Sequence, residues 1–232
     1  NFVTSFPTVN DLANADEEEV LKLWQGLGYY SRARNLHKPA KKIAFESNGE
    51  FPKTYNDLLH LKGIGEYTAA AIASFAYNEV VPVVDGNVFR VLSRVFNVNY
   101  DISLNTTKKY FMELAQKLLS TTQPNLHNQA IMEFGALQCV PKNPNCKDCV
   151  FNDSCEAYKL KIVSELPVKL KKNKITKRFL NYILIHDASG NYIMNKRTEN
   201  GIWKNLYEFP CLESDNELDE NELLLQLKNL YK

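Results

Sequence analysis

Leu61-Lys62-Gly63-Ile64-Gly65, followed directly by the letters EYTAAAI, is the segment that most strongly indicates the fold of this chain. Two glycines separated by one residue let the backbone turn tightly between two helices and point successive N–H groups outward. The leucine and isoleucine are apolar anchors for such a hairpin, and the alanines that follow permit close helix packing. N–H groups at a helix N-terminus form a site suited to a DNA phosphate, although a plain helix–helix turn would also use glycine.

Helical periodicity surrounds this hairpin and continues to about residue 160. Asp16 and Thr54 are expected to cap helices, and acids follow Asp16 in the first turn, where they suit the helix dipole. Pro39 lies inside an expected helix and should kink or break it. Helices are expected over residues 17–25, 30–47, 54–60, 66–77, 86–96, 105–120 and 125–138. The fold class is therefore mainly α.

Four of the five cysteines lie within a short segment, at Cys139, Cys146, Cys149 and Cys155. Such clustering in a chain of this size indicates metal binding in a reducing compartment rather than disulfides. The spacing leaves zinc and iron–sulfur both open. Prolines and lysines put a rigid basic loop after the first cysteine, which would face positive charge toward a phosphate backbone. Cys211 lies far away and is expected to be a buried structural thiol.

A carboxylate follows two valines in Val83-Val84-Asp85-Gly86-Asn87. In one interpretation Asp85 is simply the N-cap of the helix beginning near Gly86. In the other, the helix N-terminus favours the charged carboxylate, and this fixed anion stabilises a sugar cation as a glycosidic bond breaks. The two interpretations are compatible with each other.

Aromatic, glycine and arginine residues alternate in GLGYYSRAR, residues 26–34. This pattern suits a wedge between DNA bases with phosphate contacts beside it. Alternatively, Tyr29 and Tyr30 are core residues.

The 232 residues are 44% hydrophobic and 24% charged, as in ordinary globular proteins, and contain no apolar run near the roughly 20 residues that span a membrane. Of the net charge of +1, residues 212–232 carry −4, which leaves +5 for residues 1–211 and suits a polyanionic partner. Residues 161–178 hold seven bases and are expected to be a linker along DNA, or a solvated charge run. A hairpin of residues 182–185 and 192–194 then opens a partial α+β domain.

The motifs GLGYYSRARNL, LKGIGEYTAAAI, VDGNVFRVLSR and the four cysteines occur in an order that resembles the endonuclease III superfamily of DNA glycosylases, and within it the MutY family of adenine glycosylases. The resemblance implies a helix–hairpin–helix glycosylase domain over residues 1–160, with the cluster loop at 139–155. It also implies the basic linker at 161–178 and part of a Nudix-like lesion-recognition domain at 179–232, where GIWKNLYEFP at 201–210 carries the likeness.

The same resemblance implies roles for individual residues. Asp85 matches the aspartate that stabilises the oxocarbenium ion, and Asn87 supports it. Tyr29 matches a wedge beside 8-oxoguanine with Leu27 nearby, and Gln129 falls where the family contacts the flipped adenine. The hairpin residues and Tyr67 would lie against the DNA. The four clustered cysteines match the ligands of a 4Fe-4S cluster.

The resemblance therefore implies monofunctional hydrolysis of adenine mispaired with 8-oxoguanine or guanine, by a cytoplasmic monomer acting on duplex DNA. The family's catalytic glutamate lies in a motif of the type S-E-[IV]-M-L-Q-Q-T, which residues 1–232 do not contain, so we expect a segment before Asn1 to carry it. We also expect the last domain to continue beyond Lys232. Glycosylase–lyases of this fold place a nucleophilic lysine where Tyr67 stands, which argues against a lyase. The sequence is also compatible with a non-catalytic DNA-binding module and with a zinc-stabilised helical scaffold.

Overall fold

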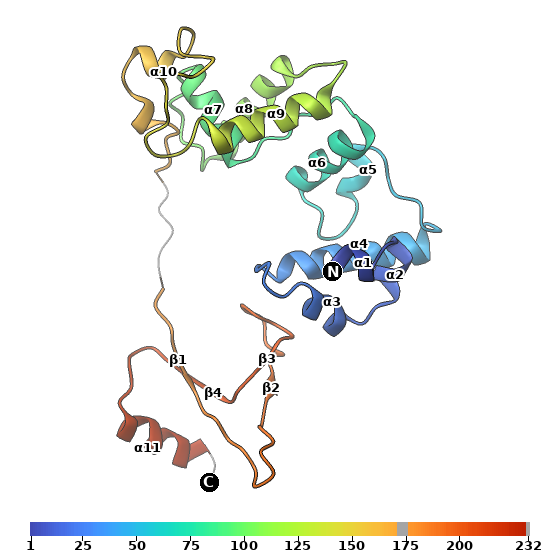
Figure 1. Cartoon of the computed structure of the whole chain (residues 1–232), viewed down its shortest axis with the longest axis vertical. Coiled ribbons are helices and arrows are strands. Elements are labelled where there is room, and N and C mark those ends of the chain that lie inside the picture. Colours follow the sequence, from blue (N-terminus) through green and yellow to red (C-terminus); the bar gives the residue numbers. More distant parts are fainter. Residues whose placement is uncertain (171–175, 231–232) are drawn as a thin grey trace. The chain divides into compact units, whose positions relative to one another are not determined.

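The computed structural model describes residues 1–170 and 176–230 (Figure 1). The chain forms two compact units, which are described separately. The first comprises Asn1, Val3–Asn14 and Arg34–Lys172, and the second comprises Phe2, Ala15–Ala33 and Asn173–Lys232. The predicted linker at 161–178 includes positions 171–175, which lie outside the described residues.

Helices dominate the first unit, as the sequence predicts. They are α2 (Val9–Asn14), α5 (Tyr55–Leu59), α6 (Glu66–Tyr77), α7 (Gly86–Val95), α8 (Asn105–Leu118), α9 (Pro124–Leu137) and α10 (Glu156–Lys159), with a 3-10 turn at Val163–Glu165. Two further helices, α1 (Phe2–Ser5) and α4 (Ser31–Glu46), have residues in both units. No helix within residues 1–170 and 176–230 is long and apolar enough to cross a membrane.

The helix–hairpin–helix element is α5, the turn at residues 60–65, and α6. Leu58 and Leu61 from its first half pack with Ala69, Ala70 and Ala73 of α6 in one buried cluster. Small alanine side chains let the two helices approach closely, so the turn between them is held from beneath. The cluster extends to Ile43, Val81 and Val83.

A second buried cluster joins α7 and α8 through Val88, Leu92 and Phe111. Met132 of α9 packs against both clusters. α9 therefore connects the hairpin half of this unit with its α7–α8 half.

Helix termini confirm some of the sequence expectations and correct others. Thr54 accepts a hydrogen bond from the Asp57 N–H at 3.2 Å and caps α5 as predicted. Asp16 precedes α3 (Glu17–Leu23), but its side chain makes no cap hydrogen bond. Of the expected kink or break at Pro39, the break is wrong, because α4 continues through this residue. Buried packing of Ala40 and Ile43 in the turns that follow offsets the hydrogen bond that proline cannot make.

The second unit contains short strands that differ from the predicted hairpin. β1 (Phe179–Tyr182) pairs antiparallel with β4 (Cys211–Ser214), and β2 (Asn195–Lys196) pairs with β3 (Tyr207–Glu208). The predicted hairpin is confirmed in part. His186 and Tyr192 form an isolated antiparallel bridge, and the Ile193 N–H donates to the Ile185 carbonyl at 3.0 Å, but no named strand covers residues 183–185 or 192–194. The turn between them is held by Asp187, whose carboxylate accepts N–H bonds from Ser189 and Asn191.

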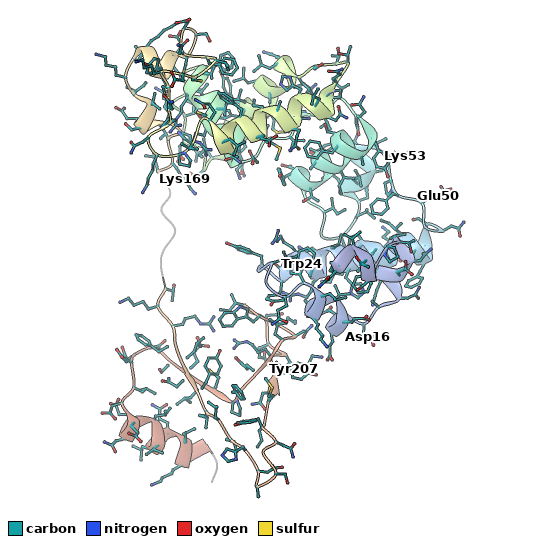
Figure 2. The ribbon with its side chains drawn as sticks, in the orientation of Figure 1. Asp16, Trp24, Glu50, Lys53, Lys169 and Tyr207 are labelled. Carbon is teal, nitrogen blue, oxygen red and sulfur yellow. The ribbon has the colours of Figure 1, made fainter. Side chains whose placement is uncertain are left out.

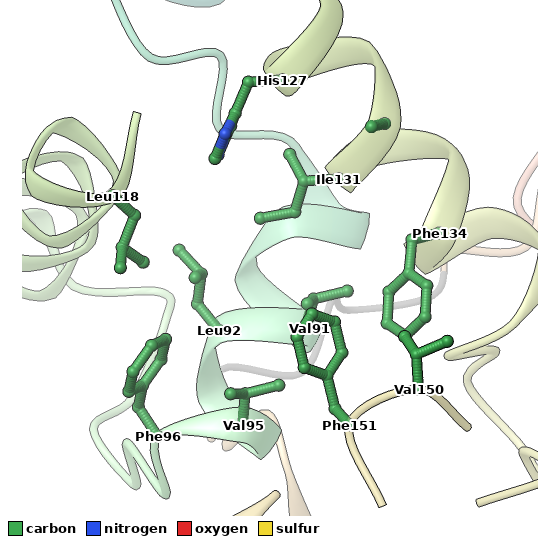
Figure 3. A pocket seen from close by; sticks show the side chains of 11 residues that line it. Val91, Leu92, Val95, Phe96, Leu118, His127, Ile131, Phe134, Val150 and Phe151 are labelled. Carbon is green, nitrogen blue, oxygen red and sulfur yellow. The ribbon is translucent and has the colours of Figure 1, made fainter. Parts of the chain in front are cut away.

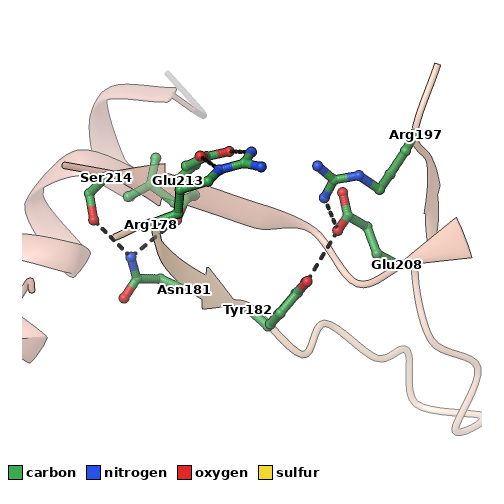
Figure 4. A network of polar contacts seen from close by, with 8 residues as sticks. Arg178, Asn181, Tyr182, Arg197, Glu208, Glu213 and Ser214 are labelled. Atoms are coloured by element: carbon green, nitrogen blue, oxygen red, sulfur yellow. Dashed lines mark hydrogen bonds and ion pairs between the residues drawn. The ribbon is translucent and has the colours of Figure 1, made fainter. Parts of the chain in front are cut away.

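Side-chain bonds reinforce the strand pairs, as Figure 4 shows. Arg178 pairs with Glu213 beside β1 and β4, and Arg197 pairs with Glu208 at 2.5 Å. The helix α11 (Glu220–Leu230) follows β4 and is not predicted from the sequence.

The first turn of α3 contacts the strands of the same unit. Glu18 pairs with Lys196 and accepts a bond from the Tyr207 hydroxyl at 3.0 Å, and Glu17 accepts one from Asn205 at 2.6 Å. The hydrogen bond from Lys196 lowers the pKa of the Glu18 carboxyl. These acids, predicted as dipole partners, therefore also bind the β2–β3 region.

Candidate functional site

Asp85 ends the extended segment before α7, and both of its carboxylate oxygens are occupied. Oδ1 accepts the Val88 N–H at 2.8 Å, which makes Asp85 the N-cap of α7 as predicted. Oδ2 accepts the Asn87 side-chain amide at 2.9 Å. Two donors from the first turn of one helix thus fix the orientation of the half-buried Asp85 carboxylate. The carboxylate is already oriented before a positive charge forms beside it, so no rearrangement is needed then.

Arg90 extends this arrangement one turn along α7. Its guanidinium donates to Asn87 Oδ1 at 2.8 Å, to the Gly135 carbonyl at 2.5 Å and to the Cys139 carbonyl at 2.7 Å. Burial lowers the pKa of Arg90, and the negative charge of Cys139 opposes that shift. Arg90 therefore sets the side-chain position of Asn87, which in turn holds Asp85.

Gly135 of α9 lies directly against Asn87. A Cβ at Gly135 would stand 2.7 Å from the Asn87 Cβ and 3.0 Å from its carbonyl oxygen, closer than such atoms approach. Glycine is therefore required here for α9 to reach α7. No local pattern singles out Gly135 or Arg90, because the contacts between α7 and the segment of Gly135 and Cys139 join positions more than forty residues apart.

The hairpin turn has two unlike glycines. Gly63 has φ +98°, and a Cβ there would lie 3.2 Å from the Asn35 backbone oxygen, whereas Gly65 has open space around it. Gly65 also precedes α6 with an ordinary extended backbone, φ −96°. Leu61 is buried, Ile64 is half-buried, and Lys62 is exposed beside the turn.

Tyr67, in the first turn of α6, lies close enough to Asp85 to respond to its charge. Burial and then the charge of Asp85 raise the pKa of its phenol. The hydroxyl therefore stays protonated, and the ring remains 48% exposed. Gln129 lies on α9 with an exposed side chain, directly after the buried Asn128.

The four clustered cysteines lie in the loop between α9 and α10, and all are half-buried free thiols. Burial raises the pKa of Cys146, and so do Cys139, Cys155 and Cys149, while Arg94 acts in the opposite direction. The thiols are thus electrostatic neighbours. Among residues 1–170 and 176–230, however, no three His, Cys, Asp or Glu side chains form a group that would hold a metal ion.

Arg94 is the second buried arginine of α7, and it binds this loop. It donates to the Val140 carbonyl at 2.8 Å, the Pro141 carbonyl at 3.0 Å and the Cys139 Sγ at 3.4 Å. The Phe151 nitrogen lies 3.4 Å from Cys149 Sγ, to which it donates. Such donors suit sulfurs that carry negative charge. Cys211, expected to be buried, is instead half-buried on β4.

The glycine–tyrosine turn belongs to the second unit and presents one aromatic ring to solvent. Tyr29 has φ 48° and is 82% exposed, which excludes the core interpretation for it. The turn is held by Trp24 (labelled in Figure 2), whose indole donates to the Gly28 carbonyl at 3.1 Å, and by Arg32, which donates to the Leu27 carbonyl at 2.9 Å. Leu27 is also exposed.

A cavity of about 440 Å³ lies elsewhere in the first unit, among apolar side chains of α7, α9 and the cysteine loop (Figure 3). Its lining includes Leu92, Ile131 and Phe134, together with the titratable side chain of His127. Among the described residues, its lining holds no carboxylate, amide or hydroxyl side chain that would process a polar substrate.

The chain is similar to known proteins along most of its length. The model of the family described as "HhH-GPD superfamily base excision DNA repair protein" matches residues 1–120. A protein named adenine DNA glycosylase from Buchnera aphidicola subsp. Baizongia pistaciae is 35% identical over 94% of this chain, and the chain spans 61% of that relative. One of the same name from Homo sapiens is 45% identical over 67% of this chain and 29% of the relative.

Solved structures agree on the fold. A thermostable thymine-DNA glycosylase matches with a TM-score of 0.62 and 29% identity, over 68% of this chain and 73% of that one. A non-covalent endonuclease III–DNA complex matches with a TM-score of 0.58 and 25% identity, over 69% and 73%. These matches confirm the predicted mainly α, helix–hairpin–helix fold. The family model covers more than half of the chain, so this protein belongs to the HhH-GPD superfamily of base excision DNA repair proteins.

Proposed function

We propose that this chain is part of an adenine DNA glycosylase that removes adenine mispaired with 8-oxoguanine or guanine and leaves the DNA strand intact. The observation that carries the proposal is the fixed Asp85 carboxylate, which both Val88 and Asn87 hold beside a helix–hairpin–helix element. Relatives named adenine DNA glycosylase support the choice of base. The chain spans about three-fifths of the Buchnera relative, so the activity is proposed for the full-length gene product.

In the proposed reaction the target adenosine leaves the base stack before chemistry. The bond between the sugar C1′ and adenine N9 then breaks, the electron pair leaves with the base, and a proton neutralises it. The family resemblance assigns this proton to a glutamate in a motif that residues 1–232 do not contain. Asp85 stabilises the sugar cation, and water adds to C1′ and loses its proton. One preorganised electrostatic group of this kind contributes roughly 3–4 kcal/mol.

DNA would be held by the hairpin turn. The N–H groups that follow Gly65 open α6 and suit a backbone phosphate, with Lys62 exposed beside them, whereas the Ile64 N–H donates to the Leu61 carbonyl at 3.0 Å and closes the turn. The exposed ring of Tyr29, with Leu27, is proposed as the wedge at the base opposite the adenine. Gln129 is proposed to contact the flipped adenine, and residues 179–232 to begin a Nudix-like lesion-recognition domain.

The four clustered cysteines are proposed to hold a 4Fe-4S cluster. Four free thiols in one loop match its ligand set, and Arg94 already donates to one sulfur. When bound, the cluster would supply four iron–thiolate bonds that clasp the loop between α9 and α10.

The test is single-turnover excision by the full-length gene product on a labelled duplex with adenine opposite 8-oxoguanine. We expect free adenine and an abasic strand that breaks only after alkali, because Tyr67 has no amine to form an imine. Asp85→Asn keeps the shape of the cap and removes the anion, so the rate should fall at least roughly 100-fold. Strand breakage before alkali together with a borohydride-trapped adduct would establish a lyase, and a fully active Asp85→Asn variant would leave Asp85 a helix cap alone.

A further inference from the structure

Asn128 joins three separate parts of the first unit through one buried side chain. It is 2% exposed, and it lies on α9 next to Gln129. Its Oδ1 accepts the Val83 N–H at 3.0 Å, and its Nδ2 donates to the Val81 carbonyl at 2.9 Å and to Ser74 Oγ at 2.8 Å. Both protons and the oxygen of the amide are therefore used.

The bonds to Val81 and Val83 replace a strand partner. Residues 81–85 form no helix or strand, so no ladder holds their backbone. In an extended segment the C=O of one residue and the N–H of the residue two positions later point to the same side. The Asn128 amide pairs with both, as a neighbouring strand would. Val83 is two positions before Asp85, which leaves a single residue between this anchor and the carboxylate.

The third bond ties this anchor to the hairpin helix. Ser74 is fully buried on α6, whose N-terminus is the proposed phosphate site. A hydrogen-bonded amide that contacts α6 and the Asp85 segment, and is itself part of α9, sets the spacing of all three. A polar group is costly to bury unless its hydrogen bonds are made, so the arrangement is specific in its geometry.

We propose that Asn128 is a positioning residue. It fixes the Asp85 carboxylate relative to α6 and α9, so that the carboxylate faces the sugar of a nucleotide whose phosphate is bound at the N-terminus of α6. The inference rests on the proposed function. It predicts that loss of the Asn128 amide separates two properties. The hairpin turn is untouched, so duplex binding persists, while the carboxylate is misplaced and excision slows. A displacement near 1 Å costs on the order of 100-fold in rate.

The experiment compares Asn128→Ala with Asn125→Ala in the full-length gene product. Asn125 is a matched control because it is an exposed asparagine on the same helix, and its oxygen accepts the N–H of the neighbouring Leu126 rather than a bond from another element. Three quantities are measured: hydrogen exchange of the Val83 amide in the free protein, affinity for a duplex with a non-cleavable adenosine analogue, and the single-turnover excision rate. Thermal unfolding verifies the fold, and Asn128→Asp replaces the alanine variant if that protein does not fold.

For Asn128→Ala we expect faster exchange at Val83 by roughly tenfold or more, affinity within about twofold of the control, and excision slower by roughly 10- to 100-fold. Unchanged Val83 exchange would overturn the anchor itself. Faster exchange with an unchanged rate, or parallel losses of affinity and rate, would overturn the positioning role. If the unmodified protein binds the analogue but releases no adenine, the proposed function is contradicted. This result is distinct from the outcomes that overturn the anchor or the positioning role.

Discussion

Replacing Gly135 with alanine tests whether the packing of α9 against Asn87 controls the candidate site. Alanine is favoured over glycine inside a helix by about 1 kcal/mol. Against this, the new Cβ would lie 2.7 Å from the Asn87 Cβ, which belongs to the rigid start of a side chain and cannot turn aside. Overpacking of this kind costs about 1–3 kcal/mol, so overpacking wins and the net loss should be about 1 kcal/mol. For a chain of this size that is about 2–4 °C in Tm.

The effect on excision should be larger than the effect on stability. Moving Asn87 weakens its bond to Asp85 and the bonds of Arg90 to Asn87 and the Gly135 carbonyl. A hydrogen bond to a charged group contributes about 1.5–3 kcal/mol, so a partial loss predicts a rate about tenfold lower. The assay is single-turnover excision beside thermal unfolding, with Leu137→Ala as control, since that side chain of α9 is 74% exposed. A Gly135→Ala protein with the stability and rate of the unmodified protein would refute this reasoning.

Two further predictions concern the hairpin and the cysteines. Gly65→Val should leave Tm nearly unchanged, because Gly65 has free space and an ordinary φ, and should weaken duplex binding irrespective of DNA sequence. Gly63→Val should lower Tm as well, since φ +98° excludes valine. Equal affinity for Gly65→Val and the unmodified protein, measured by fluorescence anisotropy, would contradict the phosphate assignment. Cys211→Ser should retain the iron content of anaerobically purified protein and Cys146→Ser should lose it; stoichiometric zinc without iron in the unmodified protein would instead support the zinc scaffold.

Local chemistry explains which features could be predicted from the sequence. The Thr54 and Asp85 caps depend on residues within one turn, and the hairpin depends on two closely spaced glycines, so short spacing is enough. The supports of the site depend on contacts between distant positions: Asn128 is 45 residues from Val83, and Arg90 is 45 from Gly135. Without knowledge of how α9 packs, Asn128 resembles an ordinary surface asparagine in the sequence. Gly135 likewise resembles a glycine that merely makes its helix more flexible.

The strand predictions are confirmed only in part, for a related reason. The predicted hairpin has its antiparallel bridge between His186 and Tyr192, but β1 pairs with β4, some thirty residues later, and no local pattern indicates that partner. Pro39 shows the opposite case, in which a strong local rule is outweighed by burial around α4. Nothing in the structure assigns a particular purpose to Pro39.

The adjacency of Asn128 and Gln129 has a consequence for engineering base preference. Successive residues of a helix point in directions about 100° apart, so Asn128 is buried in hydrogen bonds within the protein while Gln129 faces solvent. A library that randomises Gln129 would vary the side chain proposed to contact the base while the hydrogen bonds of Asn128 stay intact, whereas many variants in a library that includes Asn128 would lose those bonds. Directed evolution of this helix should therefore leave position 128 constant and sample position 129 fully.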